Sequence, residues 1–232
     1  MTFETNWLIG LHIPAALIPS PVLWSSNILF AGVLIYAAIK VEFRQLLDNR
    51  PNQHVYFGAM VGLLMLWGIK AGVSPGLGFH HLGATLFTLM FGWPLALFGL
   101  TIIMLATVLM QSNELVTLGI NGCLSIVLPV LTSFGVLWIS QRYLPDNFYI
   151  YIFVVAFFGA GLAVAVSRFA SLIVLGLVGA YPESRLVHES LMLTPLFMFP
   201  EMFVSGMLIS IFVVYKPDWV LTFEDERYII GK

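Results

Sequence analysis

Residues 82–110 read LGATLFTLMFGWPLALFGLTIIMLATVLM, a run that contains no charged side chain. A bilayer core about 30 Å thick is crossed by ~20 mostly apolar helical residues, so this run is too long for one straight span. Gly92-Trp93-Pro94 lies inside it, and proline removes a backbone donor and clashes with the preceding turn. The run therefore predicts a helix that breaks at these three residues, with residues 82–91 as a short or re-entrant piece.

The rest of the chain has the composition of a membrane protein. Of its 232 residues, 59% are hydrophobic and only 9% are charged, against roughly 25% charged residues in soluble domains. The mean hydropathy is +0.96. Further apolar runs cover residues 21–39, 54–69, 117–140, 148–180 and 190–215. We expect an all-α polytopic membrane protein, a bundle of six to seven transmembrane helices that forms a single integral membrane domain over residues 1–232.

Composition and motifs also exclude other classes of protein. The formal net charge is −2 and no basic patch occurs, so the chain lacks the electrostatic footprint of a nucleic-acid binder. It contains no H-E-x-x-H motif, which would supply a metal-activated water. We therefore expect neither nucleic-acid binding nor enzymatic activity.

The distribution of basic residues predicts how the chain is oriented, because cytoplasmic loops are rich in Lys and Arg. If residues 82–110 cross the membrane twice, most basic residues fall on one side: Lys40, Arg44, Arg50, Arg142, Lys216, Arg227 and Lys232. Only Lys70 and Arg185 remain on the other side. This predicts seven segments, the N-terminus outside and a short cytoplasmic tail over residues 217–232, with His12, His80, His81 and His188 on the outer side.

The adjacent histidines His80 and His81 lie in the stretch PGLGFHHLGATLF, residues 75–87. Neutral imidazole binds Ni, Co, Cu and Zn well. Adjacent side chains on a helix point about 100° apart, so only one of the two histidines would face a given site. The alternative is that both cap or hydrogen-bond the loop before the next span.

Arg168 lies within the apolar run of residues 148–180. An arginine at the bilayer centre costs about 2.5–3.5 kcal/mol on insertion scales. We expect this side chain to face protein or an interface, compensated by a carboxylate such as Glu201, by backbone carbonyls or by snorkelling. The stretch VTLGINGCLS, residues 116–125, combines small residues with Asn121 and predicts close helix packing.

Four segments together resemble the CbiM/NikM family, the substrate-capturing membrane components of energy-coupling-factor transporters for cobalt and nickel. LHIPAALIPSP from residue 11 is similar to the family's MHI-x-x-G-x-L-P opening, and GFHHLGATLFTLMFG from residue 78 to its H-x-x-G-x-x-L-x-x-x-L-F-G segment. TLGINGCLSIVLP from residue 117 resembles its TLG-x-N segment, and FVSGMLISIFVVYKPDW from residue 203 its final V-E-G helix.

The resemblance implies a metal site. In the family the terminal amine, a histidine in position two and a further histidine hold the cation, and these histidines correspond to His12 and His80 here. We take His12, His80 and His81 as the candidate metal ligands, although His81 has no counterpart. This chain departs from the pattern because eleven residues precede His12 and because Ser205 replaces the family glutamate. Glu201 lies one helical turn earlier.

The resemblance also implies partners and a location. A divalent transition metal, cobalt or nickel, would be the substrate, with no tightly bound cofactor. The chain has no G-x-x-x-x-G-K-[ST] loop to bind a nucleotide phosphate, so the ATPase subunits and a transmembrane coupling subunit would be separate proteins in the bacterial inner membrane, beside membrane lipid. The alternative is a transport-inactive accessory or structural subunit of a membrane complex built on the same scaffold.

Overall fold

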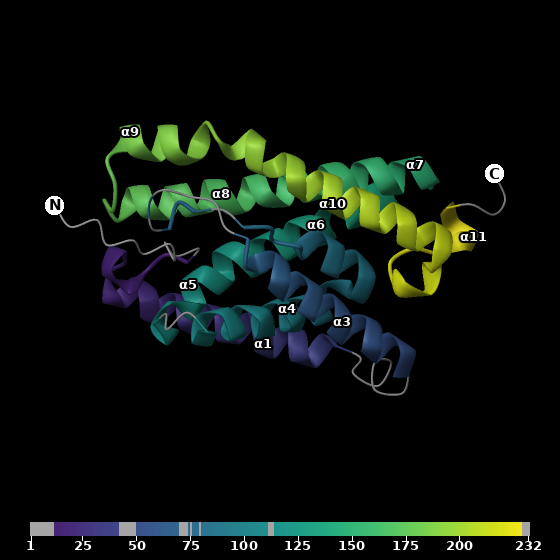
Figure 1. Ribbon diagram of the computed structural model, residues 1–232, viewed down its shortest axis with the longest axis horizontal. Coiled ribbons are helices and arrows are strands. Elements are labelled where there is room, and N and C mark those ends of the chain that lie inside the picture. Colours follow the sequence, from purple (N-terminus) through teal and green to yellow (C-terminus); the bar gives the residue numbers. More distant parts are fainter. Residues whose placement is uncertain are drawn as a thin grey trace.

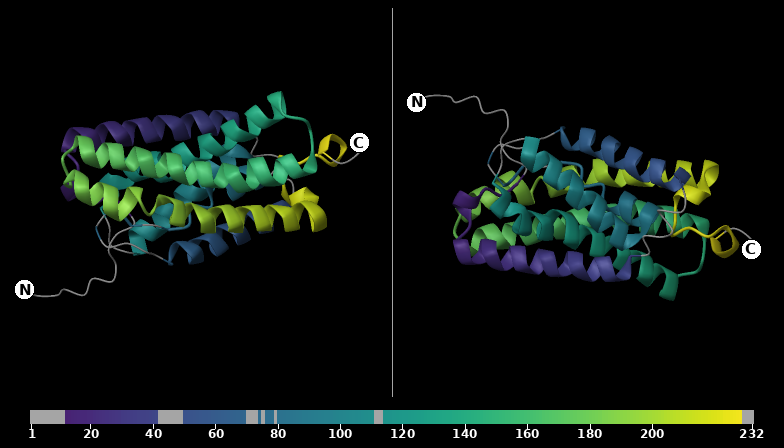
Figure 2. Two further views of the ribbon diagram at one scale, coloured as in Figure 1. Left: turned by 90° about the horizontal axis from the view of Figure 1, so that it is seen from above. Right: turned by 90° about the horizontal axis from the view of Figure 1, so that it is seen from below.

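The computed structural model describes residues 12–41, 50–69, 74, 76–78, 80–110 and 114–228. Within these ranges the protein consists of helices and connecting segments, without a strand. The long helices lie alongside one another in a bundle (Figure 1), and Figure 2 shows the same arrangement from two further sides. The predicted all-α polytopic fold is therefore confirmed.

Three long helices are α1 (Ser20–Lys40), α3 (Arg50–Trp67) and α4 (Ala84–Met110). Three further spans are assembled from consecutive pieces, each with a π-helical part: α5 (Leu118–Gly122), η3 (Cys123–Val127) and α6 (Leu128–Tyr143); α7 (Phe148–Ile150), η4 (Tyr151–Phe158) and α8 (Gly159–Leu177); α9 (Glu183–Leu186), η5 (Val187–Leu191) and α10 (Thr194–Tyr215). The short elements are η1 (Ala15–Leu17), η2 (Leu115–Thr117), η6 (Pro217–Trp219) and α11 (Asp225–Tyr228).

The helix α4 consists of two arms that meet at Gly92. This residue has φ +77° and ψ +157°, which is not helical backbone. The arms fold back on each other, because a Cβ added to Gly99 in the second arm would lie 3.1 Å from the Phe87 ring in the first. The break predicted at Gly92-Trp93-Pro94 is confirmed. The first arm, residues 84–91, is about 12 Å long and reaches less than halfway across a bilayer core of about 30 Å.

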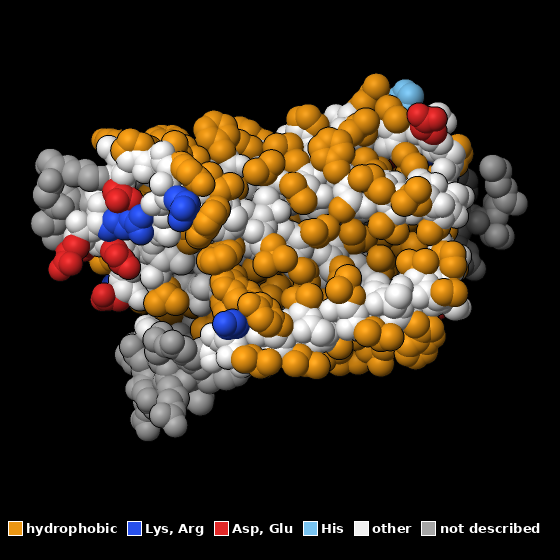
Figure 3. All heavy atoms as spheres, turned by 180° about the vertical axis from the view of Figure 1, so that it is seen from behind, with side chains coloured by type: hydrophobic (Ala, Val, Ile, Leu, Met, Phe, Trp, Pro, Cys, Tyr) orange, Lys and Arg blue, Asp and Glu red, His pale blue; other side chains and the backbone are white. Residues whose placement is uncertain are grey.

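The described helices provide seven membrane segments. Five helical stretches are long and apolar enough to cross a membrane, α3 adds a helix of 18 residues, and the break in α4 divides one stretch into two. The start of α1 and the helix α11 lie at opposite ends of the bundle (Figure 1). Apolar side chains cover the middle of the face seen in Figure 3, and charged side chains gather near the ends. The protein is thus suited to lie within a membrane.

The first arm of α4 is enclosed by the rest of the bundle. Every residue from Ala84 to Phe91 is buried, and α4 contacts α1, α3, α6, α8 and α10. Because the arm ends early at Gly92, its last carbonyls need partners from elsewhere in the chain. Leu221 N donates to Met90 O at 3.0 Å, and Thr222 N donates to Leu89 O at 3.2 Å. The segment that follows α10 therefore caps the half-helix.

The predicted close packing of residues 116–125 is confirmed. A Cβ added to Gly119 would lie 2.3 Å from the backbone N of Asn27, and one added to Gly122 would lie 2.5 Å from the Phe30 ring. Only glycine permits this approach of α5 to α1, because small residues allow two backbones in a membrane to come close. The contact places Asn121 next to the segment that precedes α1.

We predict that Gly92→Ala destabilises the protein. A side chain at φ +77° and ψ +157° lies in a region open essentially to glycine alone, and strain of this kind costs about 1–3 kcal/mol. The midpoint of thermal unfolding in detergent should therefore fall. Gly32→Ala in α1 is the matched control, because a Cβ there meets no atom within 4 Å and alanine favours the helix. Equal midpoints for the two variants would contradict the assignment of strain to Gly92.

Candidate metal site

The segment that carries His12 is held inside the bundle by Asn121. The amide of Ile13 donates to Asn121 Oδ1 at 2.8 Å, and Asn121 Nδ2 donates back to the Ile13 carbonyl at 3.1 Å. A second hydrogen bond from Nδ2 to Thr117 O at 3.0 Å fixes the amide group itself. As a result His12 is only 4% exposed.

His80 lies in the loop between α3 and α4 and is 5% exposed. Its ring centroid is 4.3 Å from that of Trp67, the last residue of α3. Burial, together with the neighbouring His12, lowers the pKa of His80 to about 3, so the imidazole is neutral at physiological pH. Its Nδ1 is 3.2 Å from the His81 carbonyl. When Nδ1 donates to that oxygen, Nε2 keeps the lone pair that a metal ion requires.

The structure brings His12 and His80 together, as the sequence predicts. Their ring centroids are 6.4 Å apart and their planes are inclined by 68°. A metal bound to one nitrogen of each ring at about 2.0–2.1 Å would hold the centroids no more than roughly 6.5 Å apart, so the observed separation is at the upper limit for a shared ion, with the ion in line between the two rings. The Thr107 hydroxyl lies 3.5 Å from His12 Nε2 and adds an oxygen beside the pair.

The part of the chain that the structure describes offers few further ligands. Within it, no group of three or more His, Cys, Asp and Glu side chains is arranged to hold one ion. The terminal amine of Met1, which the family pattern would use, lies outside the described residues. Among the described His, Cys, Asp and Glu side chains, the candidate ligands are therefore His12 and His80, with the Thr107 hydroxyl beside them.

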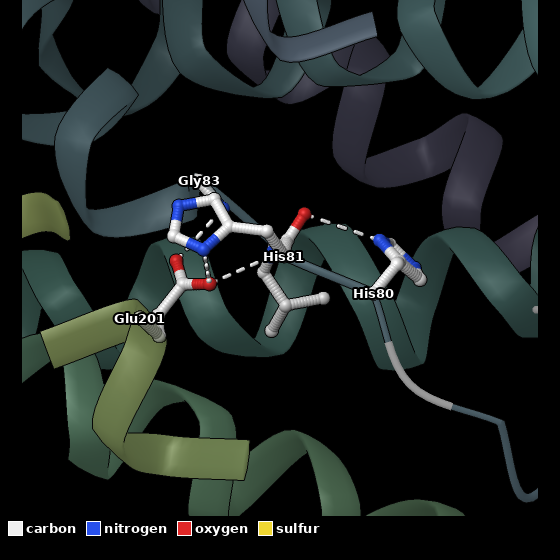
Figure 4. A network of polar contacts seen from close by, with 5 residues as sticks. His80, His81, Gly83 and Glu201 are labelled. Atoms are coloured by element: carbon white, nitrogen blue, oxygen red, sulfur yellow. Dashed lines mark hydrogen bonds and ion pairs between the residues drawn. The ribbon is translucent and has the colours of Figure 1, made fainter. Parts of the chain in front are cut away.

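His81 is turned toward a different partner. Figure 4 shows the rings of His80 and His81 leaving the loop in opposite directions, and His81 Nδ1 lies 3.0 Å from Glu201 Oε2. Burial lowers the pKa of His81, but the charge of Glu201 and the hydrogen bond to it outweigh burial, so the pKa is raised overall. The structure thus does not bring His81 to the other two histidines.

Glu201 in α10 is 1% exposed and also binds the backbone of the loop. Its Oε2 accepts from the amide of Leu82 at 2.7 Å, and its Oε1 accepts from the amide of Gly83 at 2.7 Å. These amides immediately precede α4, so the carboxylate stabilises the positive end of a helix. Ser205, one turn later, is fully buried, and its Oγ has no hydrogen-bond partner among the described residues.

The remaining predicted histidine of the outer side lies apart. His188 in η5 is exposed, and its Nδ1 is 2.7 Å from the carbonyl of Ser184. Sequence reasoning missed Thr107 and Trp67 as neighbours of the histidines, because nothing in their local sequence indicates which distant segment they meet. It noticed Asn121 but interpreted it through helix packing alone.

Comparison with known proteins identifies the family. The sequence model for CbiM, described as the cobalt uptake substrate-specific transmembrane region, matches residues 12–219. Because this match covers most of the 232 residues, the chain belongs to that family. A comparison with curated proteins found no match.

Two solved structures share the fold. A truncated transition metal transporter is 16% identical with a TM-score of 0.73, over 88% of this chain and 98% of that chain. A second transition metal transporter is 17% identical with a TM-score of 0.64, over 86% of this chain and 91% of that chain. At these identities the likeness concerns the fold, and it extends over nearly all of both structures.

We predict that Asn121→Ala destabilises the protein by releasing the Ile13 amide and carbonyl. An unpaired buried polar group costs about 1–3 kcal/mol, so the thermal midpoint in detergent should fall clearly. The control is Asn147→Ala, which removes an exposed hydrogen bond to the amide of Tyr149 at the start of α7 and should cost about 1 kcal/mol. A smaller effect at Asn121 than at Asn147 would show that the Ile13 segment is not held by this amide.

Proposed function

We propose that the protein is the substrate-binding membrane component of an energy-coupling-factor type transporter that takes up divalent cobalt or nickel. Membership of the CbiM family supports metal uptake. The observation that carries the proposal is the approach of two buried histidines, His12 and His80, whose ring centroids are 6.4 Å apart. They come from segments 68 residues apart in the chain, so their meeting is a product of the fold.

The chemistry of this pair favours transition metals. Imidazole suits Co, Ni, Cu and Zn, whereas Mg and Ca prefer carboxylate, carbonyl and water oxygens. Because His80 is neutral, it need not lose a proton before it binds the ion. His81 binds Glu201 instead and is not a ligand in this proposal. In this proposal the ion is the substrate, so it binds reversibly and no tightly bound cofactor is required.

Energy for uptake comes from other subunits in this proposal. The sequence contains no G-x-x-x-x-G-K-[ST] loop, which is the motif that binds nucleotide phosphates in P-loop ATPases. ATPase subunits and a transmembrane coupling subunit would therefore join this chain in the membrane. We assign no enzymatic activity to it.

We also propose an orientation in the bacterial inner membrane. The end of the bundle that carries α11 holds Lys40, Arg142, Lys216 and Arg227, whereas Arg185 lies at the start of the α9 span, near the opposite end. Arg44, Lys70 and Lys232 lie outside the described residues. The basic end is cytoplasmic by the positive-inside rule. The N-terminus is then outside, residues 217–232 form a cytoplasmic tail, and the two histidines are reached from the outer side.

A second candidate is a transport-inactive accessory subunit of a membrane complex. It is favoured by Ser205, which stands where the family pattern has glutamate, and by the small number of ligands among the described residues. In this case the scaffold and the Glu201 contacts would persist, but the histidine pair would not retain metal.

We predict that His12→Ala combined with His80→Ala abolishes metal retention. The double variant is purified in detergent and dialysed against Co²⁺ or Ni²⁺, and its metal content is measured by mass spectrometry. This content should fall to the background of a preparation without the protein. The matched control is His54→Ala combined with His188→Ala, which removes two exposed histidines and should retain metal like the wild type. Unchanged metal content in the His12 and His80 variant would favour the accessory subunit.

The orientation predicts which positions react from outside the cell. In a Cys123→Ser background, Glu183→Cys should react with a membrane-impermeant maleimide in intact spheroplasts, because this exposed residue starts the α9 span. Lys216→Cys, which follows α10, should react only after the membrane is permeabilised. The reverse pattern would overturn the orientation.

A further inference from the structure

Arg168 in α8 reaches across to the loop that precedes α4. Its Nη1 donates to the carbonyl of Gly78 at 2.7 Å, and its Nη2 donates to the carbonyl of Leu77 at 3.1 Å. The guanidinium also lies 5.2 Å from the ring of Phe197 in α10. The expectation that this arginine faces protein is confirmed, and backbone carbonyls are the partners that the structure gives it.

Glu201 binds the other end of the same loop. Its carboxylate accepts from the amides of Leu82 and Gly83 and from the ring of His81 (Figure 4). Among the described contacts, the guanidinium of Arg168 and the carboxylate of Glu201 thus do not bind each other. Each one binds backbone groups of the complementary kind on either side of His80.

This division follows from the chemistry of the two groups. A guanidinium has only donors and takes carbonyls, whereas a carboxylate has only acceptors and takes amides. Hydrogen bonds to an ionised group are roughly twice as strong as neutral ones. The loop therefore receives strong bonds at residues 77–78 and at residues 81–83, and His80 lies between these two attachments.

We infer that Arg168 and Glu201 are positioning residues that together hold His80 where it meets His12. The inference rests on the proposed function in so far as His80 binds the ion. Neither residue touches the substrate in this arrangement. Each acts through the backbone of the loop, one from α8 and the other from α10.

Near His80 itself, the described loop has few other directional contacts, although Ser74 Oγ donates to Glu189 Oε2 at 2.5 Å six residues earlier. Residues 80–83 belong to no helix. The other backbone hydrogen bonds of the described loop residues are local: Leu77 N donates to Ser74 O, and Phe87 N donates to Gly83 O. Packing of His80 against Trp67 contributes contact, but apolar contact is non-directional. In this inference, loss of either charged side chain lets the His80 ring shift along its neighbours.

The first test is a titration of detergent-purified full-length protein with Co²⁺ by calorimetry and by the visible ligand-field spectrum. Arg168→Gln and Glu201→Gln should each weaken binding by about tenfold or more, as loss of an outer-shell partner typically does, and should change the spectrum. Arg168→Lys should recover part of the affinity, because one ammonium group can still bind a carbonyl. The control Arg142→Gln, which changes an exposed arginine near the end of α6, should titrate like the wild type.

The second test does not depend on metal binding. In a Cys123→Ser background, His12→Cys and His80→Cys should be joined rapidly by a short bifunctional thiol reagent. Adding Arg168→Gln or Glu201→Gln should slow this cross-linking several-fold, and adding Arg142→Gln should not. If the glutamine variants do not fold, Arg168→Lys and Glu201→Asp are tested in their place. Each should slow the cross-linking, but less than complete loss of the contact between the side chain and the loop would.

The outcomes separate the two proposals. Loss of cross-linking in the variants supports the positioning roles, even if the wild type binds no Co²⁺, in which case the proposed function fails alone. Unchanged cross-linking together with an unchanged Co²⁺ spectrum overturns the positioning roles. This holds even if the thermal midpoint falls, because a lower midpoint alone shows only that the side chain contributes to stability.

Discussion

A helix that begins inside a membrane protein leaves backbone amides where water cannot reach them, and each must find a partner within the protein. The first arm of α4 begins in this way at Ala84, and it ends after two turns at Gly92. Glu201 binds the amides of Leu82 and Gly83 before the arm, and the amides of residues 221 and 222 bind its last carbonyls. Because every residue of this arm is buried, its place in the bundle depends on these caps.

Contacts to main-chain groups also position the two histidine segments. Asn121 binds the backbone of Ile13, next to His12, and Glu201 binds the backbone that follows His80. Buried polar side chains thus hold both histidine segments through main-chain groups, and the imidazoles of His12 and His80 lie edge to face with centroids 6.4 Å apart. In the proposed function, this fixed backbone keeps the two imidazoles at the separation at which they would share an ion.

The fold could be predicted because its determinants are local. The lengths of the apolar runs predicted the membrane spans, and Gly92-Trp93-Pro94 predicted the break in α4. The meeting of His12 and His80 followed from the family resemblance and is seen in the structure, while their binding of metal stays a prediction. The contacts of Glu201 could not be predicted, because they join residues 118 and 119 positions apart. The contact of His81 with Glu201 and the hydrogen bonds of Arg168 to backbone carbonyls could not be predicted either, because they also join residues far apart in the sequence.

The central claim is that His12 and His80 bind one ion side by side. The most direct measurement is X-ray absorption spectroscopy at the cobalt edge, on full-length protein loaded with less than one equivalent of Co²⁺. We expect the multiple-scattering pattern of two imidazoles, with nitrogen or oxygen atoms at about 2.0–2.2 Å in the first shell, and a pattern of one imidazole in His80→Ala. A spectrum without imidazole scattering, or one that His80→Ala leaves unchanged, would contradict the account.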